Sequence, residues 1–208
     1  MLITAIISQK KRKDRFNIFI DGKYSFALDG ETFLKYHLKK DQEITQEFVD
    51  KIIKDSEFAK WYNQTLMLIS KRPRSQKEIK DYLQRKEIGE KTLDLVIEKL
   101  QAKKFIDDSE FASWFVEQRL AFRPKGKRML QLELRQKGIA PDIIDGVLED
   151  KVSRESEYEQ ALVLARKKLP QTAVFDLELK KKLYGFLGRR GFAWETIEAV
   201  WRDLKAQI

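Results

Sequence analysis

The chain has 208 residues, of which 42 are Lys or Arg and 33 are Asp or Glu, so its formal net charge at pH 7 is +9. Apolar residues make up 42% of the sequence and aromatic residues 11%, which excludes a disordered chain even though 36% of the residues are charged. It has no cysteine, which excludes disulfides, thiolate nucleophiles and thiolate metal sites. The basic excess favours an acidic partner, which could be nucleic acid, anionic lipid or an acidic protein surface, although many basic proteins bind none of these.

The N-terminal sequence gives no sign of export. Only its first seven residues are largely apolar, and the basic residues follow them, whereas a secretory signal has the opposite order. No apolar run approaches the roughly 18 residues that cross a bilayer. The sequence therefore predicts a cytoplasmic protein with no membrane segment.

Residues 1–28 have the pattern of strands. Two alternating runs, 16–20 and 23–28, flank Asp21-Gly22, and this dipeptide is a strong hairpin signal because both residues tolerate positive φ. Together with an Ile- and Thr-rich run before them, they predict a small antiparallel sheet of two or three strands. A sheet of this size needs cover, which a short helix would supply after Asp29, its candidate cap.

A three-helix unit follows the sheet. Apolar residues recur at helical spacing over residues 48–69, after Thr45, which is a candidate N-cap. Pro73 disfavours further helix. Ser75 and Glu78 then have the spacing of a capping box, in which the hydroxyl accepts the amide of residue 78 and the carboxylate reaches back to the Ser amide. A short second helix, a turn around Ile88-Gly89 and a third helix complete the unit.

This unit repeats along the chain. Its apolar positions recur after 51 residues and, more loosely, after a further 53, as in Leu83, Leu134 and Leu187. Such a period indicates a repeated supersecondary unit whose copies bury their apolar faces together. We therefore expect a mainly α-helical fold of tandem three-helix repeats with a small N-terminal antiparallel β-hairpin or sheet. The expected domains are 1–44 (the sheet with a short helix) and three repeats at 45–106, 107–152 and 153–208.

Candidate catalytic residues are few. The one histidine, His37, lies in a basic stretch with no second metal ligand arranged near it, and the nine glycines fall at turns or helix ends rather than in a phosphate-binding loop. Asp107 and Asp108 could bind a metal as a pair, but they occupy a helix start, where Asp caps the N-terminus. The sequence therefore predicts a protein that is not an enzyme and that holds no metal or cofactor.

Two basic segments recur at the same position of the first two repeats, where the first helix ends and the second begins. Their basic residues are Lys71, Arg72, Arg74 and Lys77 in one repeat, and Arg123, Lys125, Lys127 and Arg128 in the next. Regular stacking would place them along one side as a positive stripe, which is typical of a polyanion binder. The structural alternative is that they bond helix C-terminal carbonyls and keep the surface soluble, and the sequence weighs the two about evenly.

The short helices joined by tight turns also have the outline of helix-turn-helix units. If they docked in a major groove, the candidate base readers would be Gln84, Arg85, Gln136 and Lys137. Nothing in the sequence suggests the two-fold symmetry typical of such dimers, which disfavours base-specific reading.

Three ordered motifs give a resemblance to a known family. They read Arg72-x-x-Ser75-x-x-Glu78-Ile79-x-x-x-Leu83, then Phe105-Ile106-Asp107-Asp108-x-x-Phe111-Ala112 with Arg119 seven residues later, then Gly126-x-x-x-Leu130-x-x-Glu133-Leu134-x-x-Lys137-Gly138-Ile139. Over residues 60–150 the chain resembles the RecX family of bacterial recombination regulators. The third repeat fits more loosely, and the N-terminal strands resemble an extension carried by longer members.

The resemblance implies a curved, elongated array of three-helix repeats that binds along the groove of the RecA nucleoprotein filament and inhibits its ATP hydrolysis and strand exchange. It implies a negative regulator of RecA in DNA recombination, DNA repair and the SOS response, and we expect it to act as a monomer. The residues expected to face the filament or nucleic acid are Arg72, Arg74, Lys77, Arg119, Arg123, Lys125, Lys127 and Arg128. The alternative is a helical-repeat protein that binds single- or double-stranded DNA directly, without RecA.

Overall fold

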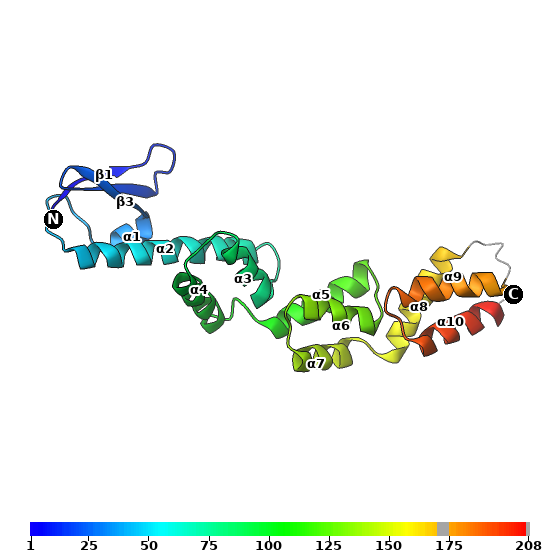
Figure 1. Ribbon diagram of the computed structural model, residues 1–208. Helices are drawn as coiled ribbons and strands as arrows, with labels where there is room; N and C mark the ends of the chain where they lie inside the picture. The colour runs from blue at the N-terminus through cyan, green and yellow to red at the C-terminus, as the bar shows by residue number, and fades with distance from the viewer. Residues whose placement is uncertain (170–174, 207–208) are drawn as a thin grey trace. The chain divides into compact units, whose positions relative to one another are not determined.

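The structure is a computed structural model that describes residues 1–169 and 175–206 (Figure 1). The chain forms two compact units. Unit 1 consists of Met1–Arg72 and Ile79–Phe105, and unit 2 consists of Pro73–Glu78 and Ile106–Ile208. The start of α3 (Gln76–Gln84), the second helix of repeat 1, therefore belongs to unit 2. The sequence pattern did not indicate this division.

The N-terminal sheet has three antiparallel strands in the order β1-β2-β3, with bounds Ile3–Ser8, Arg15–Ile20 and Lys23–Asp29. Its second turn has φ of 49° at Asp21 and 81° at Gly22, as the Asp-Gly signal predicts. One face buries apolar side chains against Val49 and Ile52 of helix α2. Asp29 caps the short helix α1 (Gly30–Lys35) by accepting the Thr32 N–H at 2.9 Å.

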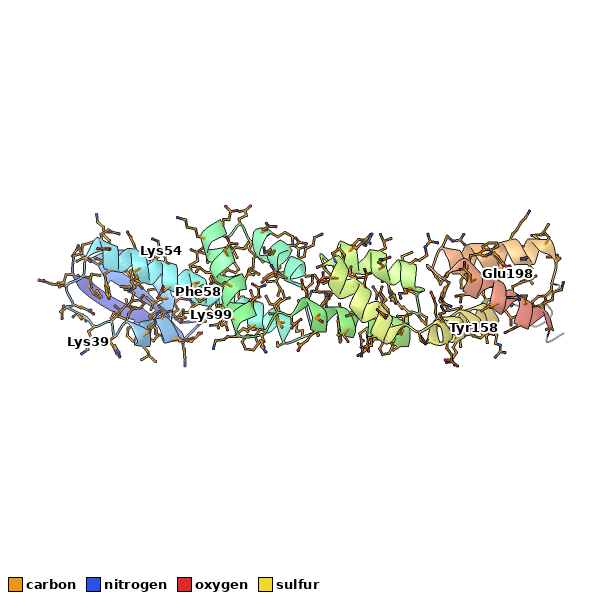
Figure 2. The ribbon with its side chains drawn as sticks, turned by 90° about the horizontal axis from the view of Figure 1, so that it is seen from below. Lys39, Lys54, Phe58, Lys99, Tyr158 and Glu198 are labelled. Atoms are coloured by element: carbon orange, nitrogen blue, oxygen red, sulfur yellow. The ribbon has the colours of Figure 1, made fainter. Side chains whose placement is uncertain are left out.

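Repeat 1 comprises α2 (Gln46–Ile69), α3 (Gln76–Gln84) and α4 (Glu90–Ala102). Thr45 caps α2 by accepting the Phe48 N–H, and the helix is unbroken over its 24 residues. The apolar stripes of α3 and α4 are buried, so their side chains form the repeat's core. On the α2–α4 surface, Lys99 Nζ lies 5.1 Å from the centroid of the Phe58 ring (Figure 2).

Repeats 2 and 3 have the same three-helix plan. Repeat 2 comprises α5 (Asp108–Phe122), α6 (Lys127–Gln136) and α7 (Pro141–Lys151). Repeat 3 comprises α8 (Arg154–Lys168), α9 (Leu177–Gly188) and α10 (Trp194–Ala206). Each has its own buried apolar cluster, in which Leu134 and Leu187 occupy matching places with no exposed surface. The 53-residue offset therefore predicts the core of repeat 3 correctly.

The turn between the second and third helices recurs with one backbone feature. Gly138 and Gly191, which are 53 residues apart, have φ of 80° and 83°. Their counterpart in repeat 1, 51 residues before Gly138, is Glu87, with φ of 54°. The turn that was predicted around Ile88-Gly89 thus has its left-handed residue at Glu87, while Gly89 is the N-cap of α4.

The fold class is confirmed as mainly helical, with three three-helix domains and an N-terminal three-stranded antiparallel sheet. The domain limits at 44, 106 and 152 and the curved, elongated shape stay predictions. Among residues 1–169 and 175–206, no helix is long and apolar enough to cross a membrane. The same residues contain no group of three or more His, Cys, Asp or Glu side chains that could hold a metal ion.

Candidate functional site

The two basic segments occupy matching places in their repeats. Arg72 follows the C-cap of α2, and Arg123 is the C-cap of α5. The next helices, α3 and α6, begin at Gln76 and Lys127, which are 51 residues apart. The structure therefore keeps the register of the segments, but their side chains have different surroundings.

In the first segment, Arg74 and Lys77 bond within the chain. Lys137 Nζ lies 2.6 Å from Glu78 Oε1, and Arg74 Nη1 lies 3.8 Å from Glu78 Oε2, with the Glu78 side chain 13% exposed. Lys77 Nζ donates to the carbonyl of Gln136, near the end of α6, at 3.1 Å. Arg74 and Lys77 thus have the structural role that was the alternative to a binding stripe, because their charges meet a carboxylate and a helix C-terminus.

Arg119 is also engaged within the chain. Its Nε donates to Glu133 Oε2 at 2.7 Å, and its Cζ lies 4.5 Å from the centroid of the Phe115 ring. The pair ties α5 to α6, and the side chain of Arg119 is 30% exposed. The geometry therefore gives Arg119 a packing role in repeat 2.

The second segment is different. Arg123, Lys127 and Arg128 are exposed and Lys125 is half-buried. Among the described residues, none of these four side chains has an ion pair or a hydrogen bond. The first turn of α6 carries no acidic residue, and cations are unfavourable there because the helix N-terminus is itself partly positive. These four residues, which we call the α6 cation cluster, therefore have no ion-pair partner for their side chains in the described part of the chain.

The difference in ion pairing between the segments comes from one position. Glu78, which neutralises Arg74 and Lys137, has Met129 as its counterpart 51 residues later. The counterparts of Arg74 and Lys137 are still basic, namely Lys125 and Arg190. The second segment thus keeps the cations of the first and lacks its carboxylate.

The backbone beneath the α6 cation cluster is held by repeat 3. Gly126 N–H donates to the Arg190 carbonyl at 2.9 Å, and Lys127 N–H donates to Glu157 Oε1 of α8 at 2.9 Å. A Cβ atom built on Gly126 would lie 2.3 Å from backbone atoms of Gly191. This close approach requires glycine and fixes the start of α6 against the α9–α10 turn.

An equivalent junction holds the first segment. Ser75 Oγ donates to the Lys137 carbonyl at 2.8 Å, and Gln76 N–H donates to Asp108 Oδ1 at 2.8 Å. Ser75 also accepts the Glu78 N–H, so the hydroxyl half of the predicted capping box is observed. Asp107, rather than Asp108, caps α5, and burial raises the pKa of the Asp108 carboxyl above its ordinary value.

Sequence reasoning missed this pair of junctions. Their signal was present in the offsets, since Ser75 aligns with Gly126 and Lys137 aligns with Arg190. However, the two carboxylates that accept the backbone N–H groups, Asp108 and Glu157, are 49 residues apart. The 51-residue offset therefore does not align them.

Of the four predicted base readers, two bond within the chain and two are exposed. Lys137 is paired with Glu78, and Arg85 Nε donates to the carbonyl of Asp81 at 3.1 Å. Gln84 and Gln136 are exposed. Because two of the four have intramolecular partners, the structure adds no support for base-specific reading.

Unit 1 has a separate groove of about 800 Å³ between α1, α2 and α4. Phe58 and Leu95 form part of its apolar lining (Figure 2 shows Lys54, Phe58 and Lys99). The charged lining residues are four lysines, Lys35, Lys54, Lys91 and Lys99, and four acids, Glu31, Asp55, Glu57 and Glu98. The groove therefore lacks the charge excess found around α6.

Comparisons with known proteins agree with this architecture. The N-terminal domain of regulatory protein RecX matches residues 1–45, and the first, second and third three-helix domains of RecX match residues 62–100, 107–148 and 155–201. The chain is 32% identical over 209 residues to a regulatory protein RecX of Listeria monocytogenes, with 100% of this chain and 77% of the relative covered. It is 36% identical over 202 residues to one of Bacillus subtilis, with 95% and 75% covered.

A shorter relative and two solved structures give the same result. The regulatory protein RecX of Clostridium acetobutylicum is 33% identical over 206 residues, with 97% of this chain and 95% of the relative covered. A crystal structure of regulatory protein RecX superposes with a TM-score of 0.73 at 28% identity, covering 96% of this chain and 98% of the other. RecX from Lactobacillus salivarius, at 24% identity and a TM-score of 0.61, shares the fold over 72% of this chain and 97% of the other.

Proposed function

Since the chain belongs to the RecX family of regulatory proteins, we propose that it binds the RecA–DNA filament and inhibits its ATPase and strand-exchange activities. In this role it acts in the cytoplasm as a negative regulator of recombination, DNA repair and the SOS response. It needs no cofactor and performs no catalysis, since its effect comes from occupying the filament.

The α6 cation cluster is the observation that carries this proposal. Among the described residues, the side chains of Arg123, Lys125, Lys127 and Arg128 make no ion pair, and the nearby Glu157 carboxylate accepts a backbone N–H of α6 instead of pairing with them. A filament of protein and DNA presents carboxylates and phosphates, both of which such a cluster attracts. Because repeat 3 holds the backbone of Gly126 and Lys127, the cations are presented from a fixed base.

The other four residues that were expected to face the filament are less suitable for a test of binding. Arg74, Lys77 and Arg119 bond within unit 2, so their removal affects folding as well as binding. Arg72 lies at the end of unit 1 and is half-buried. A test of the proposal therefore uses the α6 cation cluster and leaves these residues unchanged.

The test is the rate of ATP hydrolysis by RecA on single-stranded DNA as the protein is added. The test variant replaces all four cluster residues by Gln, and the matched control replaces four other exposed basic residues of unit 2, Arg135, Arg154, Lys181 and Lys205. We expect the wild type and the control to inhibit, and the cluster variant to need at least about tenfold more protein, since four charge contacts are lost. Equal inhibition by the three proteins, with equal far-ultraviolet circular dichroism, would remove the cluster from the binding surface.

The same cluster supports one alternative, a protein that binds DNA directly and acts without RecA. In that case the wild type leaves the ATPase of a preformed filament unchanged but binds bare DNA with a steep salt dependence, with a log–log slope of about 0.9 per phosphate contact for duplex DNA. Inhibition of the ATPase at protein amounts well below one per RecA would exclude this alternative.

A further inference from the structure

The N-terminal sheet has an outer face that nothing in unit 1 covers. All residues of unit 1 are described, and its helices α1 and α2 lie on one side of the sheet (Figure 1). Cross-strand neighbours on the other side include Ala5, Phe19 and Tyr24 in one row and Ile7 with Asn17 in the next. Tyr24 is 58% exposed and Ile7 is 51% exposed. This face therefore presents aromatic and aliphatic side chains to solvent.

The two aromatic rings of this face are in contact. The centroids of Phe19 and Tyr24 are 5.9 Å apart at an interplanar angle of 78°, an edge-to-face pair. Phe19 is half-buried and supports the more exposed Tyr24. A flat ligand can therefore stack on Tyr24 without any rearrangement of the sheet.

A dense basic loop borders the same sheet. The β1–β2 loop contains Lys10, Lys11, Arg12 and Lys13, all exposed, and one acid, Asp14, so it contributes 4 − 1 = +3 of the chain's net charge of +9. In the described part of the chain, no side chain of these four residues has an ion pair or a hydrogen bond. In this respect the loop is like the α6 cation cluster.

Backbone and side-chain hydrogen bonds tie the loop to the ends of β1 and β2. Gln9 N–H donates to the Arg15 carbonyl at 2.9 Å, and Arg15 N–H donates to the Arg12 carbonyl at 2.9 Å. Ser8 Oγ donates to the Lys13 carbonyl at 3.2 Å, and Gln9 Nε2 donates to Asn17 Oδ1 at 2.8 Å. The cations are thus kept together despite their repulsion, beside the outward-facing row that includes Asn17.

We propose that the β1–β2 loop and the outer face of the N-terminal sheet bind single-stranded nucleic acid. The phosphates contact Lys10, Lys11, Arg12 and Lys13, and a base stacks on Tyr24. Phe19 is four residues from Arg15 along β2, so the aromatic pair lies roughly 13 Å from the base of the loop, at about 3.3 Å per residue. A basic surface beside a stackable aromatic ring is the arrangement that single-strand binders use.

Other polyanions fit the surface less well. An acidic protein would meet Tyr24 and Ile7 as exposed side chains on the sheet face, whereas most of the energy in protein interfaces comes from anchors buried in well-packed pockets. Duplex DNA would satisfy the cations, but its bases are already stacked and could not use Tyr24. The site lies in unit 1, whereas the α6 cation cluster lies in unit 2, so this inference does not rest on the proposed function.

The test uses the full chain without RecA and a labelled oligothymidylate of about 20 nucleotides, long enough to span the surface. Fluorescence anisotropy gives the association constant between about 0.05 and 0.2 M salt. The loop variant replaces Lys10, Lys11, Arg12 and Lys13 by Gln. The matched control replaces four exposed lysines elsewhere in unit 1, Lys39, Lys40, Lys91 and Lys103. A second pair of variants is Tyr24→Ala and Tyr24→Phe.

We expect the loop variant to lose at least tenfold in affinity at about 0.1 M salt, with the log–log slope reduced by about 2.8, from four contacts at about 0.7 each. Tyr24→Ala is expected to weaken binding roughly 5- to 150-fold, while Tyr24→Phe keeps it, because stacking needs the ring and not the hydroxyl. Absence of binding by the wild type, or equal losses in the loop variant and its control, would overturn the inference. Tighter binding to the duplex of the same length, unaffected by Tyr24→Ala, would overturn it in favour of a duplex site. RecA inhibition is measured separately, so either proposal can fail alone.

Discussion

Replacing Gly126 by Ala tests whether repeats 2 and 3 are joined as described. Gly126 has φ of −70° and ψ of 161°, which any residue adopts, so the substitution causes no backbone strain of its own. Its cost is steric, because the new Cβ would lie 2.3 Å from the carbonyl carbon and oxygen of Gly191, where carbon contacts need about 3.5 Å. Relief requires the start of α6 to move by more than about 1 Å from the α9–α10 turn.

That movement breaks identifiable bonds. It separates Gly126 N–H from the Arg190 carbonyl and Arg128 N–H from the Gly191 carbonyl, which contribute about 1 kcal/mol each. Overpacking against the backbone adds about 1–3 kcal/mol. We therefore expect Gly126→Ala to lower the free energy of unfolding of unit 2 by about 3–5 kcal/mol.

The assay combines urea denaturation, followed by circular dichroism, with hydrogen exchange at the amides of residues 126 and 128. The control is Gly146→Ala, since a Cβ there meets nothing within 4 Å in α7, and Ala should stabilise that helix by about 1 kcal/mol. If Gly126→Ala changes stability by less than about 0.5 kcal/mol and leaves both amides protected, Gly126 and Gly191 are not packed as closely as a 2.3 Å Cβ contact implies.

Two further predictions concern backbone conformation and titration. Glu87→Gly should raise stability by about 0.5–1 kcal/mol in urea denaturation, because Glu87 has φ of 54° where its counterparts are glycines, and an unchanged or lower stability would contradict this. The raised pKa of Asp108, caused first by burial, means that the folded chain binds this proton more tightly than the unfolded chain. The stability of the wild type relative to Asp108→Asn should therefore fall as pH rises from about 3 to 7, and a difference that stays constant or grows would show that burial does not control this carboxyl.

Local features of this fold could be predicted from the sequence because they depend on neighbours along the chain. The caps at Asp29, Thr45 and Ser75 bond to amides three residues away, as capping side chains do. The apolar offsets identify buried positions in all three repeats because helical spacing alone decides which side faces a core. The Asp21-Gly22 turn follows from the φ values these two residues tolerate.

Contacts between repeats could not be predicted in this way. Whether Arg74 is neutralised depends on Glu78 and on Lys137, which is 59 residues from Glu78. Whether Gly126 can approach Gly191 depends on a backbone 65 residues away. The sequence shows basic residues at both segments without distinguishing them, whereas in the structure the cations of only one segment form ion pairs among the described residues.

One substitution should give the second segment the carboxylate that it lacks. Met129 is half-buried in the first turn of α6, at the position that Glu78 occupies in α3. A carboxylate there should reach Lys125, as Glu78 reaches Arg74 four residues before it. Met129→Glu should therefore preserve the fold, since an acid is favourable in the first turn of a helix.

The same substitution should weaken inhibition of the RecA ATPase, because it neutralises part of the α6 cation cluster from within. The control is Met129→Gln, because Gln has the shape of Glu without its charge. The loss of inhibition should be larger for the Glu variant than for the Gln variant, and the difference should shrink as the salt concentration is raised. If both variants inhibit like the wild type while circular dichroism is unchanged, the missing carboxylate is incidental. In that case the α6 cation cluster is a consequence of repeat divergence and not the surface by which this protein acts.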